Sequence, residues 1–194
     1  MISNPNIFPD SNYYRQTGTS PLECWYNPTN ITSVGATVTT FPIDKILAWA
    51  FISGSGNLVN KIAVNVTSLT TAGDKGRIGI YTSTSQANLY PDELIADSGE
   101  LDFSTTGVKS VTINKKLIPN QVYWAAYIGG GSTINLRTPG TTGVNTLLGN
   151  SPSSFTVFNY GISATLSYAA LPATFTSGAA FDTLRCPVNM LFTS

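Results

Sequence analysis

Short apolar runs and alternating segments follow one another along the chain, and almost none has the spacing of an amphipathic helix. Residues 46–52 and 122–128 are continuous apolar runs, which predict strands buried on both faces. Residues 61–67 alternate between apolar and polar side chains, as a strand with one buried face does. Further short strands are predicted at residues 77–82, 94–97, 100–103, 108–113, 134–136, 162–168 and 188–192. The pattern predicts an all-β chain.

Turn signals separate these segments at intervals of about eight to twelve residues, which is typical of β-sandwiches and barrels. The chain shows no strand–helix alternation, no internal repeat and no linker that would divide it. Its 194 residues are enough for one sizeable hydrophobic core. We therefore expect a single β domain over residues 31–194.

Residues 1–30 differ in composition from the rest of the chain. They contain four prolines, which interrupt regular sheet pairing. They also contain several aromatic residues, whose large apolar surfaces favour burial: Phe8, Tyr13, Tyr14, Trp25 and Tyr26. The segment is predicted to be an extended, irregular arm that packs on its own domain or docks on a neighbouring subunit. Because Tyr and Trp are enriched at protein interfaces, docking is favoured over stacking on a sugar ring.

The chain is poor in charge and electrically balanced. Charged residues make up 10% of the sequence, against about 25% in an average soluble domain. Ten basic residues balance ten acidic ones, and Lys115 and Lys116 form the one adjacent basic pair. Affinity for phosphates needs clustered basic residues, so no nucleic-acid partner is expected. A neutral, charge-poor surface favours self-association, so we expect a homo-oligomer.

No apolar stretch approaches the ~18 residues that a membrane helix needs, so no membrane insertion is expected. The first residues lack the basic start and apolar run of a secretion signal. The chain is therefore expected in the cytoplasm of the cell that makes it, unless a particle carries it out. Cys24 and Cys186 are favoured as buried free thiols over a disulfide.

Histidine is absent from the sequence. This excludes Ser-His-Asp and Cys-His triads and the commonest zinc ligand. Five of the ten acids lie within residues 92–102: Asp92, Glu93, Asp97, Glu100 and Asp102. Two carboxylates at a suitable separation could hydrolyse a glycosidic bond, and Asp97, Glu100 and Asp102 are candidate calcium ligands. A solvated strand edge is favoured over both, so no catalytic residue, metal or cofactor is assigned.

Residues 129–131 are three consecutive glycines after an apolar run. They lack the Lys-Ser/Thr pair and the following helix of a phosphate-binding loop. We expect a flexible hairpin tip there.

Four pieces of the chain share the pattern of a known module. They are LVNKIAVNVT at residues 58–67, GRIGIY at 76–81, YPDELIADSGELD with TTGVKSVTI at 90–102 and 105–113, and LIPNQVYWAA at 117–126. In these pieces, residues 44–128 resemble a jelly-roll module of bacteriophage tail and fibre proteins and related virion proteins. The resemblance implies a jelly-roll β-sandwich, a homotrimer and a place in the virion after synthesis in the host cytoplasm. It assigns no functional residue.

These observations favour a bacteriophage virion structural protein that is not an enzyme. It would be a tail fibre, head decoration or adaptor component that attaches to other virion proteins through its N-terminal arm. One alternative is a tail receptor-binding module that serves host attachment by recognising a surface glycan. A second alternative is a polysaccharide depolymerase that uses the acids in residues 92–102.

Overall fold

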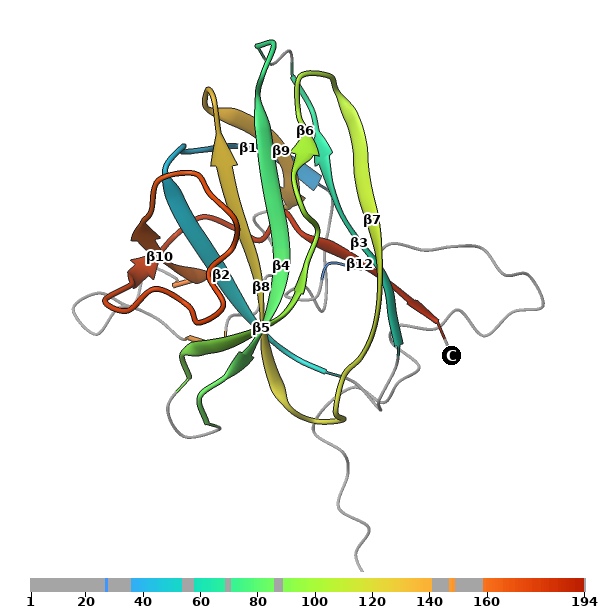
Figure 1. Ribbon diagram of the computed structural model, residues 1–194, viewed down its shortest axis with the longest axis vertical. Coiled ribbons are helices and arrows are strands. Elements are labelled where there is room, and N and C mark those ends of the chain that lie inside the picture. The colour runs from blue at the N-terminus through green and yellow to red at the C-terminus, as the bar shows by residue number, and fades with distance from the viewer. Residues whose placement is uncertain are drawn as a thin grey trace, which may run out of the picture.

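The chain folds into two antiparallel β-sheets that lie face to face as a β-sandwich (Figure 1). The computed structural model describes residues 27, 36–53, 58–68, 71–85, 89–140, 147–148 and 159–193. Within these ranges the secondary structure consists of strands and turns, without a helix. No segment there is a helix that could cross a membrane. The predicted all-β class is confirmed.

The smaller sheet, called sheet A, contains five strands, and the larger sheet, called sheet B, contains seven. Sheet A runs in the order β1 (Ala36–Phe41), β9 (Ile134–Pro139), β3 (Leu58–Val66) and β12 (Asn189–Thr193), and β7 (Gly107–Lys116) also pairs with β3. Sheet B runs in the order β11 (Ala180–Asp182), β10 (Gly161–Thr165), β2 (Lys45–Ile52), β8 (Val122–Gly130), β4 (Lys75–Ser83) and β5 (Pro91–Asp97), and β6 (Leu101–Asp102) also pairs with β4.

Most of the predicted strands coincide with observed ones, and the differences have local causes. β1 was not predicted because its sequence, ATVTTF, contains few large apolar residues. β11 is only three residues long, which is too short for a periodic signal. The strand predicted at residues 162–168 ends at Thr165, because the chain then leaves the sheet. The two sheets also use strands on both sides of residues 44–128.

The main core lies between the sheets and is built by alternation along the strands. In β2, Leu47, Trp49 and Phe51 face this core and are almost fully buried. The inward residues of β3, among them Ile62 and Val64, meet them from sheet A. This is the alternation that the sequence predicted for residues 61–67.

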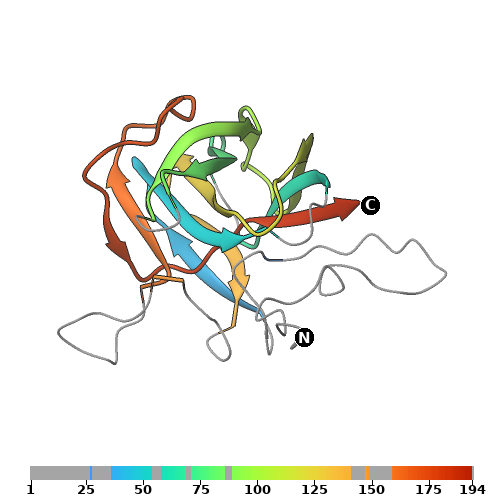
Figure 2. The ribbon, with the colours of Figure 1, turned by 90° about the horizontal axis from the view of Figure 1, so that it is seen from below.

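Sheet B buries its outer face as well. The even-numbered residues Ile46, Ala48 and Ala50 of β2 belong to a second apolar cluster on that face, together with Trp124 of β8. Residues 166–179, which we call the strap, cover this cluster; Figure 2 shows this orange-to-red segment outside the sheet. Burial on both faces is the physical reason for the continuous apolar runs at residues 46–52 and 122–128.

Several glycines of sheet B leave no room for a Cβ atom, and two of them, Gly79 and Gly130, lie against the strap. A Cβ atom on Gly79 would lie 2.5 Å from Leu171 Cδ1 of the strap and 2.6 Å from the carbonyl oxygen of Ala96. A Cβ atom on Gly130 would lie 2.5 Å from the ring of Tyr168. The flexible tip predicted at residues 129–131 is therefore wrong in part. Gly129 and Gly130 are buried residues of β8, and only Gly131 lies in the turn, with a φ of +99°.

The Asp74 side chain joins the turn before β4 to the turn between β8 and β9. Its carboxylate accepts hydrogen bonds from the amide and hydroxyl of Ser132, at 2.7 and 2.8 Å, and from the amide of Thr71 at 2.6 Å. Burial by itself would raise the pKa of Asp74, but these hydrogen bonds outweigh it and hold the pKa below 3.8. Asp74 therefore stabilises the fold in its ionised form.

Cys186 is a buried free thiol in the main core, as the sequence favoured. Burial raises its pKa to about 12. Cys24 lies outside the described residues.

The Asp74→Asn substitution is expected to lower the free energy of unfolding at pH 7 by about 1–3 kcal/mol, because an amide cannot accept all three hydrogen bonds. The folded-state pKa of Asp74 lies below its unfolded value, so its contribution is lost as the pH falls. The stability difference from the wild type should therefore shrink below pH 3.8. Urea unfolding from pH 7 to pH 2.5 measures both effects. Asp92→Asn, at a carboxylate without a hydrogen bond in the described structure, is the control.

The Gly79→Ala substitution is expected to cost about 1–3 kcal/mol, because the new methyl group meets both a strap side chain and the backbone of β5. Ser110→Ala, on the exposed face of β7, is the matched control and should change stability by less than about 0.5 kcal/mol. Chemical unfolding of the three proteins gives the comparison. An unchanged midpoint for Gly79→Ala would contradict the close contact with the strap.

Candidate functional site

The five aromatic residues predicted to bind a partner, Phe8, Tyr13, Tyr14, Trp25 and Tyr26, lie outside the described residues. The structure does describe Asn27, which directly follows them. The Nδ2 group of Asn27 donates hydrogen bonds to the carbonyl oxygens of Cys186, at 2.9 Å, and Val188, at 3.1 Å. The chain is therefore fixed to the sandwich immediately after Trp25 and Tyr26, next to the start of β12.

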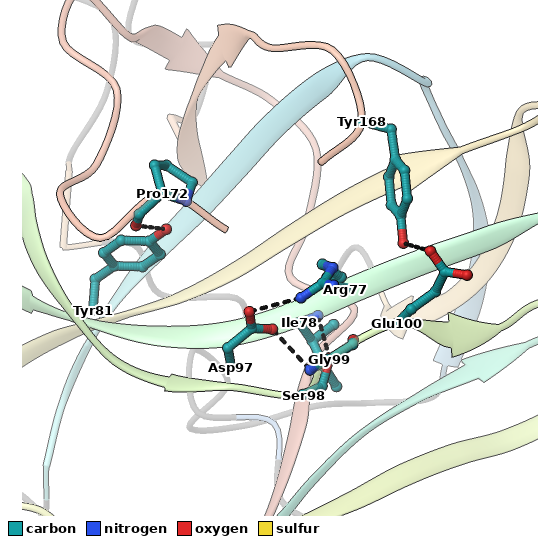
Figure 3. Close-up of polar contacts among 9 residues, drawn as sticks. All are labelled: Arg77, Ile78, Tyr81, Asp97, Ser98, Gly99, Glu100, Tyr168 and Pro172. Atoms are coloured by element: carbon teal, nitrogen blue, oxygen red, sulfur yellow. Dashed lines mark hydrogen bonds and ion pairs between the residues drawn. The ribbon is translucent and has the colours of Figure 1, made fainter. Parts of the chain in front are cut away.

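The acidic segment at residues 92–102 forms β5, a turn and β6, and its Asp97 closes the turn. Asp97 Oδ2 lies 2.8 Å from a terminal nitrogen of Arg77 on β4, and Asp97 Oδ1 accepts a hydrogen bond of 2.9 Å from the Gly99 amide (Figure 3). The hydroxyl of Ser98 accepts a hydrogen bond from the amide of Ile78. Both carboxylate oxygens of Asp97 are thus used within the sandwich.

Glu100 links the turn to the strap. Glu100 Oε2 accepts a hydrogen bond of 3.2 Å from the Tyr168 hydroxyl (Figure 3). The same oxygen lies 3.3 Å from Lys75 Nζ. The Lys75 ammonium group also lies over the Tyr168 ring, 5.1 Å from its centre. Burial and the neighbouring Glu100 carboxylate raise the pKa of Tyr168 to about 12, with Arg77 acting in the opposite direction. Tyr168 therefore remains a hydrogen-bond donor at neutral pH.

Asp102 has a separate, local role. Its Oδ1 atom accepts hydrogen bonds from the hydroxyl and the amide of Ser104. These two bonds, with a smaller effect of Lys109, hold the pKa of this exposed carboxylate below 3.8. This geometry is a capped turn at the start of the connection to β7.

The three calcium candidates are consequently not gathered around one point. Asp97 binds Arg77, Glu100 binds Lys75 and Tyr168, and Asp102 binds Ser104. Within the described ranges, no three His, Cys, Asp or Glu side chains form a group that could hold a metal ion. The same contacts engage both carboxylate oxygens of Asp97 and one each of Glu100 and Asp102.

Five of these side chains form one connected set, which we call the clasp: Lys75, Arg77, Asp97, Glu100 and Tyr168. The clasp joins β4 and the β5–β6 turn to the beginning of the strap. Further bonds hold the rest of the strap to the same sheet. The Tyr81 hydroxyl donates to the carbonyl of Pro172 at 2.8 Å, and the Leu94 amide donates to Ala173 at 2.9 Å (Figure 3 for Tyr81). The clasp is therefore a fastening of the strap over the apolar face of sheet B.

The sequence predicted the acids of this set but neither its cations nor its tyrosine. Lys75 and Arg77 lie two residues apart on one strand, a spacing that places their side chains on the same face. That signal was available from the sequence. The contribution of Tyr168 was not, because it lies 68 residues from Glu100 along the chain.

Comparisons with models of known protein families and with curated proteins found no match for this chain. The class of protein that the structure defines is therefore given by its fold, an antiparallel β-sandwich with one sheet buried on both faces.

The Tyr168→Phe substitution is expected to lower stability by about 0.5–1.5 kcal/mol, because it removes the hydrogen bond to Glu100 and keeps the ring under Lys75. The loss of stability should be confined to the strap and its contacts. Hydrogen exchange should accelerate at amides that the strap contributes or binds, such as those of Leu166, Tyr168 and Phe175. Exchange in sheet A should stay unchanged. Glu93→Gln, on the same acidic segment outside the clasp, is the control and should leave strap exchange as in the wild type.

Proposed function

We propose that the sandwich is a jelly roll and that the chain is a structural component of a bacteriophage virion. The order of strand pairing supports the first part. β1 pairs with β9, β2 with β8, β3 with β7 and β4 with β5, all antiparallel. These pairs are nested along the chain, as in a long hairpin rolled into two sheets. The result is one sheet with β1, β9, β3 and β7 and a second with β2, β8, β4 and β5, with the remaining strands added to them. Double-sheet jelly rolls of this kind occur in viral capsid and lectin domains.

A fold does not fix a function, so the proposal of a building block rests on the site. The observation that carries it is the clasp. Two of the five acids in residues 92–102, Asp97 and Glu100, belong to the set that fastens the strap to sheet B. The strap in turn packs over the outer apolar face of sheet B. This favours a fibre, decoration or adaptor component over a depolymerase.

The proposed attachment to other virion proteins is through residues 1–30. Aromatic side chains in a proline-interrupted segment are suited to burial in a partner surface. Asn27 supports this division of the chain, because its hydrogen bonds to Cys186 and Val188 give the segment a fixed root on the sandwich. A receptor-binding role in host attachment would use the same body with a glycan as the additional partner.

A chain that lacks residues 1–26 but keeps Asn27 tests this attachment. The truncated protein is expected to unfold at the same temperature as the full chain, within about 2 °C, because the bonds of Asn27 are retained. It is expected to be missing from phage particles purified from cells that express it in place of the full chain. Quantitative mass spectrometry of the particles measures occupancy. A full-length chain with Phe8, Tyr13 and Tyr14 changed to Ser should show an intermediate loss.

Incorporation of the truncated chain at normal occupancy would contradict the role of residues 1–30. The absence of the full chain from all purified particles would contradict the virion assignment itself. Binding of the isolated chain to a host glycan would favour the receptor-binding alternative. Polysaccharide cleavage that Asp97→Ala and Glu100→Ala together abolish would favour the depolymerase.

A further inference from the structure

Strands at the margins of the two sheets differ in how their outer edges are protected. An open edge offers a row of unpaired backbone N–H and C=O groups to another strand, and proteins block it by cover, charge, bulges or short length. In sheet B the strap covers β5, because the Leu94 amide donates to the Ala173 carbonyl at 2.9 Å. The Phe175 amide donates to the Asp92 carbonyl at the same distance. At the other margin β11 is only three residues long, so β5 and β11 are both protected.

Sheet A protects some of its margin strands and leaves β1 open. β7 contains three lysines, and its pairing with β3 shifts register beside Asn114, whose φ is +47°. Next to β12, the Val188 carbonyl accepts a hydrogen bond from Asn27. β1 has none of these features, because its sequence, ATVTTF, is uncharged and contains neither proline nor glycine. Its Thr and Val residues have high β-propensity, so β1 is suited to pairing with a further strand.

The open edge of β1 consists of the backbone groups of alternate residues. The Thr67 amide donates to the Asn135 carbonyl at 2.9 Å, so the backbone groups of Asn135 point from β9 toward β3. Because these groups alternate in direction along a strand, the neighbours of Asn135 in β9 point theirs toward β1. Their partners in β1 are Thr37, Thr39 and Phe41. The backbone groups of Ala36, Val38 and Thr40 therefore point away from β9, and they have no hydrogen-bond partner in the described structure.

This edge is complementary to itself. When two copies of β1 lie antiparallel about a twofold axis at Val38, Val38 is opposite Val38 and Ala36 is opposite Thr40. Each N–H on the edge then meets a C=O of the other copy, which gives about six hydrogen bonds. The side chains match as well, because the 51% exposed Val38 meets a second valine and Thr37 meets Thr39 on the other face. Thr–Thr pairs are favourable across antiparallel strands, and this register places no charge opposite another.

We propose that two copies of this chain pair through β1, so that sheet A continues from one copy into the other across a twofold axis. The contact uses the same open edge of both copies, and it therefore closes at the dimer instead of continuing as a filament. The resemblance found in the sequence implied a homotrimer, whereas this contact gives a dimer. The inference goes beyond the virion role proposed above and does not depend on it, and its test needs only the purified full chain.

Substitution at the proposed axis tests both the contact and its register. Val38→Lys and Val38→Glu each place two like charges opposite each other and should weaken dimerisation at least about tenfold. An equimolar mixture of these two variants places Lys opposite Glu and should form a heterodimer within about threefold of the wild-type affinity. Sedimentation velocity over a range of protein concentrations measures each association. Val108→Lys, at a 58% exposed valine of β7, is the matched control and should dimerise as the wild type does.

Val38→Pro tests the backbone hydrogen bonds directly. It removes the N–H donor at the axis, and an edge strand tolerates proline where its N–H faces solvent. The variant should stay folded, as thermal unfolding would show, and should be monomeric. A wild type that is monomeric at all concentrations would overturn the inference. Association that persists unchanged in Val38→Lys and Val38→Pro would also overturn it, because the contact would then lie elsewhere. Failure of the Lys and Glu variants to associate when mixed would refute the twofold register at Val38.

Discussion

Contact between the strap and the outer face of sheet B is the interaction on which the rest of the structure depends. The strap is irregular, yet it covers an apolar cluster that includes Trp124 and Ile46, both fully buried. Without this cover, sheet B would expose a broad apolar surface that water penalises at roughly 25 cal/mol per Å². Sheet A has no such requirement, since its outer face carries Thr, Asn, Ser and Lys side chains. Within the described residues the sandwich is therefore asymmetric, because apolar clusters lie on both faces of sheet B and only on the inner face of sheet A.

The cover explains how the polar groups nearby are used. The strap has little regular pairing of its own, so tyrosine hydroxyls and backbone groups of sheet B hold it at defined points. The clasp adds ion pairs and a cation–π contact near the beginning of the strap. Asp97 and Glu100, which the sequence offered as candidate catalytic or calcium-binding residues, thus help to hold the strap on sheet B.

Much of the fold could be predicted from residue patterns. The two apolar runs become β2 and β8, and the alternating segment becomes β3, because side-chain period and burial are local properties of a strand. Strand β1 could not be predicted in this way, because the Thr and Val residues of ATVTTF form a strand without giving a strong apolar pattern. The glycines were interpreted as a flexible tip, because the close ring of Tyr168 comes from a distant part of the chain.

By itself, the sequence determined that the chain is all-β, that two strands are buried on both faces, that histidine chemistry is excluded and that charge is scarce. Only the tertiary structure decided which acids meet which cations and what covers sheet B. The physical reason is the sequence separation over which each property is set. Burial and alternation are set by neighbours along the strand, whereas the bond between Tyr168 and Glu100 depends on segments brought together by folding.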